Sequence, residues 1–238
     1  AAELGADWVD VGGAKFAPGP EIPAEEELDR VLPVVEAVAE RSDVVISVDT
    51  FRASVAAACI AAGAHVVNDT TGLSDPEMTA VVAETGASLV VTHSLAAPRR
   101  PHPRPRYDDV VTEVRAFLDE RVEQAMAAGV GEEQLFIDPG HDLNKNTRHS
   151  LELTRRFDEI AALGLPSLAA VSNKDFVGES LGVVKSERTE GSIVAATVCA
   201  LLGARVVRMH DVAASVKAMR MLETVLGFRE PVQEVHNV

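Results

Sequence analysis

The sequence predicts an α/β fold of the (β/α)8 TIM-barrel type, in which parallel strands alternate with helices. Seven short runs rich in Val, Leu and Ile recur along the 238 residues. Each run is continuously apolar rather than alternating, which is typical of parallel strands covered on both faces. The segments between the runs repeat apolar residues with a helical period, and several end on Gly, a common helix stop signal. Seven such units favour a barrel, which commonly fills about 250 residues.

The expected strands fall one short of a complete barrel. An open, doubly wound sheet is the alternative, but no Gly-x-Gly-x-x-Gly pattern follows an early strand. The opening residues 1–5 are typical of the last turn of a helix. We therefore expect residues 1–238 to form a single barrel domain, with the first strand and most of the first helix missing from this sequence. Strands are expected at 7–11, 44–48, 65–68, 88–92, 135–138, 168–171 and 205–208.

Periodicity and start signals place the helices between these strands. Pro33 lies within one apolar helical face, so it is expected to kink or restart that helix. Ser74-Asp75-Pro76-Glu77 combines a capping box with a Pro near the first turn, which predicts a helix start. Further helices are expected at about 28–38, 111–126, 146–162, 187–202 and 211–226.

The composition argues against several classes of partner. The formal net charge is −15 and no long basic run occurs, so neither nucleic acid nor an anionic membrane is an expected partner. No apolar run approaches the ~18 residues of a membrane span, and we recognise no signal peptide. Cys59 and Cys199 are isolated in Ala-rich surroundings, as buried thiols of a reducing compartment would be. We therefore expect a cytoplasmic protein.

Polar residues follow nearly every predicted strand. In parallel α/β barrels the functional site lies where the strands end. A single Asp at such a position is often only the cap of the next helix. For Asp49, Asp69 and Asp211 taken singly, a capping role is as well supported as a binding role. Six or seven polar ends on one face exceed what capping explains, so they predict a binding site. These residues are Asp10, Asp49, Asn68–Asp69, Thr92–His93, Asp138, Ser172–Lys174 and Arg208–His210.

The chemistry of these strand ends is complementary, and together they suit a flat heterocycle with a donor edge at one end and an anion at the other. A metal site is less favoured, because no His-x-x-x-His, Cys-x-x-Cys or carboxylate cluster has ligand spacing. Ser172 lacks the sequence context of a hydrolase nucleophile. The acceptors are Asp49, Asp138 and Asn68, and the donors and cations are Lys174, Arg208 and His210.

Two connections stand out for their composition. Residues 12–23 follow the first expected strand and are rich in Gly and Pro. Residues 94–106 contain four Pro and four Arg, and they exceed the usual length of a strand-to-helix loop. This longer connection is either a solvated insertion or a lid over an anionic substrate.

In chain order, the strand ends resemble the signatures of the dihydropteroate synthase family. The resemblance implies a barrel transferase of folate biosynthesis that condenses 6-hydroxymethyl-7,8-dihydropterin pyrophosphate with p-aminobenzoate, giving dihydropteroate and pyrophosphate. It extends from about residue 4 to residue 228. The matching motifs are Asp10-Val11-Gly12-Gly13 with Pro18-Gly19, Ser47-Val48-Asp49-Thr50, Asn68-Asp69, Ile137-Asp138-Pro139-Gly140, Ser172-Asn173-Lys174 and Arg208-Met209-His210-Asp211.

The resemblance also implies roles for the pterin-facing residues. Asp138 would accept from the adjacent N–H donors of the pterin's amino-pyrimidine edge. Asp49 and Asn68 would complete the pterin pocket. Lys174 would reach the carbonyl side of the pterin, and Arg208 would lie against the ring.

The second substrate and the leaving anion would occupy the other half of the site. Ser172, Pro18 and Leu143 would bind p-aminobenzoate. The anion would be held by Arg208, His210 and Lys15, and displacement at the pterin methylene would depend on Lys174, Arg208 and His210. Mg2+ would be bound mainly through the substrate pyrophosphate. The family commonly pairs as dimers, so a homodimer is expected.

The sequence departs from the family pattern in this second half. Lys15-Phe16-Ala17 stands where the family has Ser-Thr-Arg, and Lys lacks the fork geometry of Arg. Asn173 replaces an Arg, and residues 141–144 replace a turn rich in Gly and Phe. Two alternatives therefore stay open: a paralogue that binds a pterin without condensation, and a methyltetrahydrofolate-dependent methyltransferase, against which Arg208 and His210 argue.

Overall fold

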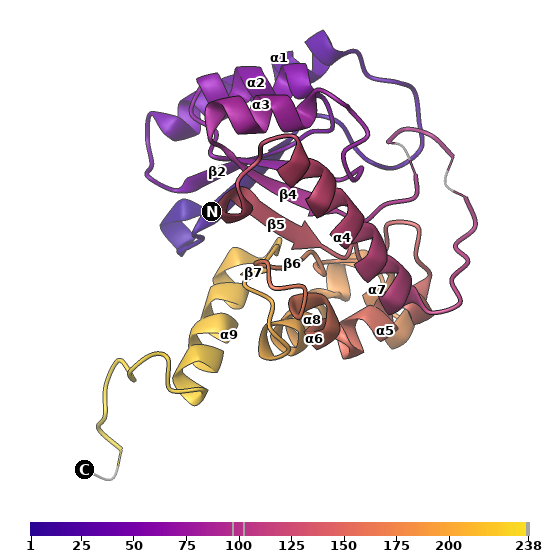
Figure 1. Cartoon of the computed structure of the whole chain (residues 1–238). Coiled ribbons are helices and arrows are strands. Elements are labelled where there is room, and N and C mark those ends of the chain that lie inside the picture. The colour runs from indigo at the N-terminus through magenta and orange to yellow at the C-terminus, as the bar shows by residue number, and fades with distance from the viewer. Residues whose placement is uncertain (97, 102, 237–238) are drawn as a thin grey trace.

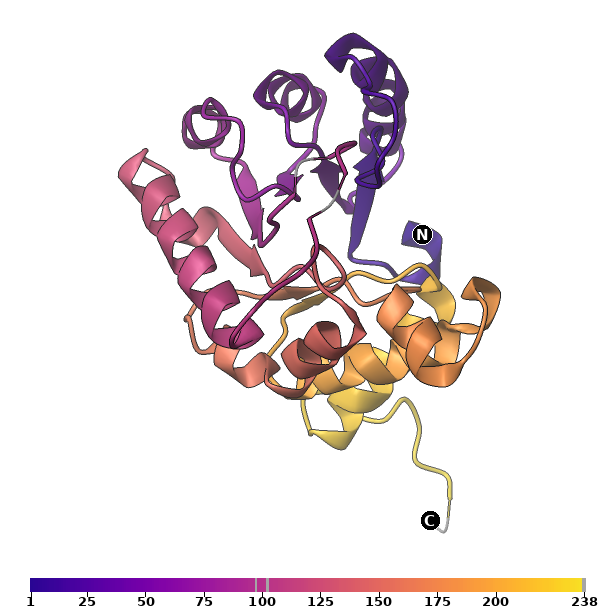
Figure 2. The ribbon, with the colours of Figure 1, turned by 90° about the vertical axis from the view of Figure 1, so that its right-hand side faces the viewer.

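Parallel strands lie at the centre of the protein and helices surround them (Figures 1 and 2). The computed structural model describes residues 1–96, 98–101 and 103–236. Each predicted strand overlaps one that is present, so the parallel α/β architecture is confirmed. In these residues the strands are β1 (Trp8–Gly12), β2 (Val45–Asp49), β3 (Val66–Asp69), β4 (Ser88–Thr92), β5 (Leu135–Asp138), β6 (Leu168–Ala169) and β7 (Val206–Val207).

The sheet follows chain order around the barrel. β1 to β5 pair consecutively, β6 pairs with β7, and a bridge between Ile137 and Ser167 joins the two groups. No pairing joins β7 to β1 within the described ranges, so the barrel is open at a seam between these two strands. The short 3-10 helix η1 (Ala2–Leu4) contacts the last helix, α9 (Val212–Val225), beside this seam (Figure 2).

The helices agree with the predictions except in their details. α1 runs unbroken through Pro33, so the predicted restart does not occur. The helix expected at 146–162 is two helices, because the backbone at Arg156 (φ −111°, ψ 32°) leaves the helical region. The remaining elements are α1 (Ala24–Ala39), α2 (Ala53–Ala61), α3 (Met78–Thr85), α4 (Val110–Ala127), η2 (Glu132–Gln134), α5 (Thr147–Arg155), α6 (Phe157–Ala161), α7 (Asp175–Leu181), η3 (Lys185–Glu187) and α8 (Thr189–Leu201).

The polar cluster before α3 does not cap that helix, so the predicted capping box is wrong. The Ser74 hydroxyl bonds the Thr71 hydroxyl at 2.7 Å instead of capping a helix. The Asp75 carboxylate accepts the backbone N–H of Ala53 at 2.8 Å, at the start of α2. α3 itself begins at Met78 without a side-chain cap. The cluster therefore fastens a neighbouring helix rather than its own.

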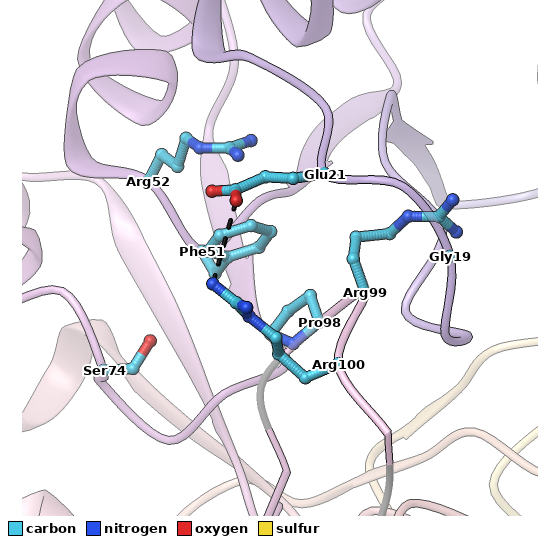
Figure 3. Close-up of a pocket in the computed structure, with 8 residues that line it drawn as sticks. All are labelled: Gly19, Glu21, Phe51, Arg52, Ser74, Pro98, Arg99 and Arg100. Carbon is cyan, nitrogen blue, oxygen red and sulfur yellow. Dashed lines mark ion pairs between the residues drawn. The ribbon is translucent and has the colours of Figure 1, made fainter.

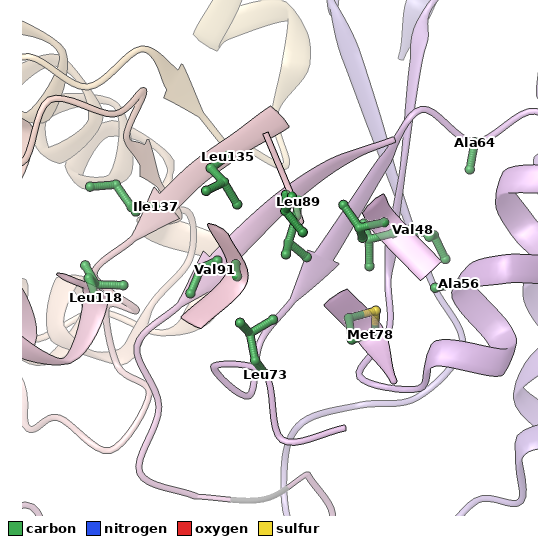
Figure 4. Packing of buried hydrophobic residues seen from close by; sticks show 14 of the residues in the cluster. Val48, Ala56, Ala64, Leu73, Met78, Leu89, Val91, Leu118, Leu135 and Ile137 are labelled. Carbon is green, nitrogen blue, oxygen red and sulfur yellow. The ribbon is translucent and has the colours of Figure 1, made fainter. Parts of the chain in front are cut away.

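Apolar side chains form three buried clusters, one of which packs β6 and β7 against α6, α7 and α8. The largest cluster lies between the other strands and helices, where Val48, Leu89 and Ile137 are fully buried (Figure 4). A smaller cluster fills the barrel interior, and in it Trp8 meets Phe136 edge-on with ring centroids 5.3 Å apart. This apolar interior leaves the carboxyl ends of the strands as the place for polar chemistry. The thiols of Cys59 and Cys199 are buried, as predicted.

Candidate active site

The polar strand ends face the barrel interior, because side chains alternate along a strand. Five residues of the interior apolar cluster each lie two positions before a polar residue, which points to the same side nearer the carboxyl face. The ladder also places Asp49 beside Asn68 and Thr92 beside Asp138. The structure therefore gathers these side chains. The pairs are Trp8 and Asp10, Val66 and Asn68, Val90 and Thr92, Phe136 and Asp138, and Val206 and Arg208.

Three other polar strand ends have structural roles. Asp69 accepts the hydroxyl and backbone N–H of Thr71 at 2.6 and 2.7 Å. His93 packs edge-on against Phe117 of α4, with ring centroids 4.7 Å apart. Asp211 caps α9 through the N–H of Ala214 at 3.1 Å. The capping explanation therefore holds for Asp211, whereas Asp49 makes no such bond to α2 within the described chain.

Asp10 contacts three residues of the site, although sequence reasoning listed it among the polar strand ends without assigning it a specific role. Its carboxylate accepts Arg208 Nε at 2.6 Å, Ser47 Oγ at 2.8 Å and Asn68 Nδ2 at 3.2 Å. The ion pair with Arg208 crosses the open seam between β7 and β1. Asp10 thus fixes one predicted cation and one predicted amide. Its position at a strand end was the available signal.

Asp49 lies in an unfavourable environment for a negative charge. Burial raises its pKa to about 7, and the nearby carboxylate of Asp10 contributes, while Arg208 opposes the shift. Two carboxylates that share one site do not ionise independently. Asp49 is therefore poised to exchange a proton near neutral pH or to accept a hydrogen bond from a ligand.

Asp138 ends β5 as a buried carboxyl group aimed into the barrel. Gly140 donates its backbone N–H to Oδ1 at 2.7 Å. Burial raises the pKa of Asp138, while the Gly140 N–H and the charges of Lys174 and Lys145 act to lower it. Oδ2 receives no hydrogen bond from any described residue. Asp138 is thus an oriented acceptor with one oxygen available to a ligand.

The other predicted cations, Lys174 and His210, follow β6 and β7. Lys174 immediately precedes α7, and burial lowers its pKa while Asp142 and Asp138 favour its charged form. Ser172 Oγ lies 2.9 Å from His210 Nδ1 and accepts the His210 backbone N–H at 3.0 Å. Partial burial lowers the pKa of His210, and so do neighbouring cations, first among them Arg208. The lowered pKa favours the neutral imidazole of His210.

Two interior polar atoms have no partner. Asn68 Oδ1 and Thr92 Oγ1 are buried, and neither makes a hydrogen bond within the described chain. An unpaired buried polar atom costs roughly 1–3 kcal/mol. Both atoms belong to side chains that face the same interior as Asp138, so a polar ligand there would satisfy them. Sequence reasoning listed Thr92 among the polar strand ends but assigned it no specific role.

The two long connections are fastened to each other. The backbone of Arg99 makes two hydrogen bonds to residues 12–23. Its N–H donates to the Phe16 carbonyl at 3.2 Å, and its carbonyl accepts the Gly19 N–H at 3.2 Å. Its guanidinium donates to the carbonyls of Ala17 and Pro20 at 2.9 Å each. A pocket of about 230 Å³ lies between these connections and Phe51, with Arg100 paired to Glu21 across it (Figure 3).

Three residues predicted for the second half of the site are placed less directly. Lys15 and Pro18 are exposed, and no contact joins Lys15 to Arg208 or His210 in the part of the chain described. Leu143 is half-buried, and its carbonyl accepts Lys145 Nζ at 2.9 Å. The structure thus groups the predicted pterin-binding residues closely and leaves Lys15 apart from the other cations.

The described residues contain no group of three or more His, Cys, Asp or Glu side chains placed to hold a metal ion. They also include no helix that is both long and apolar enough to span a membrane.

Comparison with known proteins places this arrangement in a family. The model of the family described as "Pterin binding enzyme" matches residues 1–210. Dihydropteroate synthase of Escherichia coli is 40% identical over 227 residues, covering 95% of this chain and 80% of that protein. A protein of Mycobacterium tuberculosis named inactive dihydropteroate synthase 2 is 43% identical over 244 residues, covering 98% and 76%.

A solved structure agrees with these relatives. Dihydropteroate synthase of Xanthomonas albilineans in complex with 7,8-dihydropteroate superposes with a TM-score of 0.86 at 38% identity, covering 94% of this chain and 81% of that one. The polar strand ends and their inward orientation agree with these similarities in sequence and structure. The chain belongs to the pterin-binding enzyme family that includes the dihydropteroate synthases.

Proposed function

We propose that the chain binds 6-hydroxymethyl-7,8-dihydropterin pyrophosphate and condenses it with p-aminobenzoate to dihydropteroate. The placement of Asp138 carries the proposal. Its carboxyl group is buried, oriented by Gly140 and open to a ligand at one oxygen. Such a carboxylate suits the adjacent N–H donors of a pterin's amino-pyrimidine edge. Asp49 and Asn68, at the ends of β2 and β3, would complete the pterin pocket.

The cations Arg208, His210 and Lys174 are assigned to the leaving pyrophosphate and the pterin carbonyl. In the reaction the amine nitrogen of p-aminobenzoate attacks the pterin methylene carbon. The new C–N bond forms as the C–O bond to pyrophosphate breaks, the electron pair leaves with the pyrophosphate, and the amine releases a proton. Arg208, held by Asp10, and His210 would stabilise the departing anion, and Lys174 would reach the pterin carbonyl. Fixed charges of this kind act mainly by positioning and electrostatic stabilisation.

The second substrate would lie beside the leaving anion. Ser172 would bind the p-aminobenzoate carboxylate, with Pro18 and Leu143 against its ring. The Ser172–His210 hydrogen bond supports this placement, because it joins the residue proposed to bind the p-aminobenzoate carboxylate to a residue proposed to hold the leaving anion. Mg2+ would arrive on the pyrophosphate oxygens and neutralise part of their charge, since the described residues offer no cluster of their own.

We further propose that the protein is a cytoplasmic homodimer. Four apolar side chains on α8 and α9 are more than half exposed, and pairing two chains through them would remove that surface from water. Sedimentation velocity at micromolar concentration tests the proposal, and a monomer would contradict it. The side chains are Val194 (62%), Leu201 (54%), Met221 (62%) and Val225 (68%).

A second candidate function is pterin binding without condensation. Two observations favour it: Lys15 is exposed and separate from the other cations, and the Asn173 side chain makes no hydrogen bond within the described chain. The family Arg expected at position 17, two residues after Lys15, and the one expected at position 173 would each add a bidentate anion contact that Ala17 and Asn173 do not supply. The 43% identical relative named inactive supports the same candidate.

Calorimetry and a turnover assay on the full-length protein separate the two functions. Pterin binding is measured first, and then product formation from the pterin pyrophosphate and p-aminobenzoate with Mg2+. Binding with turnover supports the condensation. Binding without turnover leaves the second candidate, and no pterin binding removes both.

Asp138→Asn tests the assignment of the pterin pocket. Loss of the charged acceptor is expected to weaken pterin binding at least about 100-fold, because each charge-assisted hydrogen bond contributes about 1.5–3 kcal/mol. Circular dichroism is expected to remain unchanged. Asp69→Asn, a strand-end carboxyl group that faces away from the interior, is the matched control and should keep the wild-type affinity. Equal affinities for Asp138→Asn and wild type would show that the pocket lies elsewhere.

A further inference from the structure

The turn after Asp138 is a fixed polar structure in this chain. Asp142 and Asn144 both adopt left-handed backbone conformations, with φ of 64° and 53°. Asp and Asn are among the residues that tolerate this region best. The Lys145 ammonium donates to the carbonyls of Gly140 and Leu143 at 3.0 and 2.9 Å, so it closes the turn on itself. A side chain on this turn therefore has a defined direction.

The Asp142 carboxylate joins this turn to the segment that carries Lys174. Its Oδ2 accepts the backbone N–H groups of Asp175 at 2.5 Å and Phe176 at 3.3 Å, the first two residues of α7. Its Oδ1 accepts the Ser150 hydroxyl at 2.8 Å, and the Asp142 N–H donates back to that hydroxyl at 3.1 Å. Lys174 is the residue directly before α7. The helix that follows Lys174 is thus capped by a residue from another strand-end turn.

We propose that Asp142 is a positioning residue for Lys174: from the turn after β5 it caps α7, fixes where Lys174 enters the site, and supplies a negative charge beside its ammonium. The inference rests on the proposed pterin-binding function, because Lys174 is the residue assigned to the pterin carbonyl. It assigns a role to a residue at which this chain departs from the family turn.

The charges around Lys174 make this role testable. They come from four residues at three strand ends: Asp138 ends β5 and Asp142 lies in the turn after it, Asp49 ends β2, and Arg208 follows β7. Burial lowers the pKa of Lys174, Arg208 lowers it further, and the three carboxylates oppose that, with Asp142 acting most strongly among them. Removal of the Asp142 charge alone would therefore let the Lys174 ammonium lose its proton at lower pH.

Two substitutions separate charge from geometry. Asp142→Asn keeps an oxygen acceptor for the α7 N–H groups and removes the charge. Asp142→Gly accepts the left-handed backbone without strain and removes both the cap and the charge. Asp211→Asn is the matched control, because Asp211 caps α9 with one comparable bond and does not figure among the charges that act on Lys174.

The readout is the reactivity of the Lys174 amine toward trace acetic anhydride from pH 6 to 11, followed by mass spectrometry. For Asp142→Asn we expect an unchanged circular dichroism spectrum and a labelling midpoint at lower pH than in wild type. The alkaline limb of pterin affinity, measured by calorimetry, should move in the same direction. Asp142→Gly should weaken pterin binding at every pH, and Asp211→Asn should match wild type in both assays.

One outcome overturns the inference: a labelling midpoint of Lys174 in Asp142→Asn that coincides with wild type. A merely structural cap would give that result, because the isosteric amide preserves the fold. Failure of wild type to bind a pterin at any pH would instead overturn the proposed function. The labelling experiment needs no ligand, so it would still decide whether Asp142 controls Lys174.

Discussion

Replacing His141 with Phe tests the electrostatics of the turn that follows β5. His141 is fully buried, with ring centroids 6.3 Å from Phe157 and 5.9 Å from Phe176. Its Nε2 lies 3.2 Å from Thr154 Oγ1, and its Nδ1 has no partner in the described chain. Thr154 also donates to the Ser150 carbonyl at 2.9 Å, so it retains that bond in the variant.

The structure gives the magnitude and sign of the effect. Burial, reinforced by the charges of Lys145 and Lys174, lowers the pKa of His141 to about 3. The unfolded chain takes up this proton near pH 6.5, whereas the folded protein does so only near the lowered value. The unfolded state therefore binds more protons between these limits, and stability is lost as the pH falls below about 6.5. At pH 5 the loss is about 1.5 × 1.36, or about 2 kcal/mol.

Phe carries no titratable proton, so the variant escapes this loss. Its packing cost or gain is common to both pH values and cancels in the comparison. The change in the free energy of unfolding caused by His141→Phe should therefore favour the variant by about 2 kcal/mol more at pH 5 than at pH 7. For a chain of this length that corresponds to about 4–8 °C in Tm.

Urea unfolding followed by circular dichroism at the two pH values measures this difference. An equal effect of His141→Phe at the two pH values would falsify the assignment of His141 as a buried neutral imidazole.

Two further substitutions test the backbone and the interior of the site. Gly140→Ala, at φ 68°, places a Cβ 2.2 Å from the carbonyl oxygen of His93, so urea unfolding should show a free energy of unfolding lower by at least about 3 kcal/mol. The control Gly86→Ala, at φ 73° with no atom within 4 Å, should lower it by only about 1 kcal/mol. Equal losses in the two variants would contradict the clash. Thr92→Val removes a hydroxyl whose oxygen is unpaired, so the fold should be at least as stable as wild type while calorimetry shows pterin affinity reduced about fivefold. Unchanged affinity would show that the Thr92 hydroxyl does not touch the pterin.

The strands and the polar strand ends were well predicted from the sequence because both are local patterns. A continuous apolar run followed by Asp138 or Asn68 needs only one strand and the general rule for parallel barrels. The alternation of side chains then sorts inward from outward residues without further information. This is why Asp138 and Arg208 could be expected to face the interior at the strand ends, and why the same alternation is enough to set Asp69 and His93 apart from the inward-facing residues.

The features that were missed depend on partners distant in sequence. Arg156 interrupts the helix predicted at 146–162, where its guanidinium bonds Asp109 of the α4 cap at 2.8 Å as well as Glu159 nearby. Asp75 caps α2 rather than α3 for the same kind of reason. Local propensity is a weak prior that such tertiary contacts override. The role of Asp142 could not be predicted either, because its partners begin a helix after the next strand.

The departures from the family pattern in the second half of the site are of two kinds. Asn173 has φ 56°, its N–H donates to Ser192 Oγ at 2.9 Å, and its carbonyl accepts Arg188 at 2.9 Å. An Asn tolerates that conformation better than an Arg would. Asp142 likewise uses both carboxylate oxygens. Asn173 and Asp142 thus each make specific contacts of their own in this structure. Lys15, in contrast, makes no contact with Arg208 or His210, the cations it was expected to join. Residues 12–23 are therefore the chief place to test whether the protein condenses its substrates or only binds a pterin. Restoring an Arg at position 17 (Ala17→Arg) should raise affinity for the pyrophosphate end of the pterin substrate without altering affinity for the pterin alone.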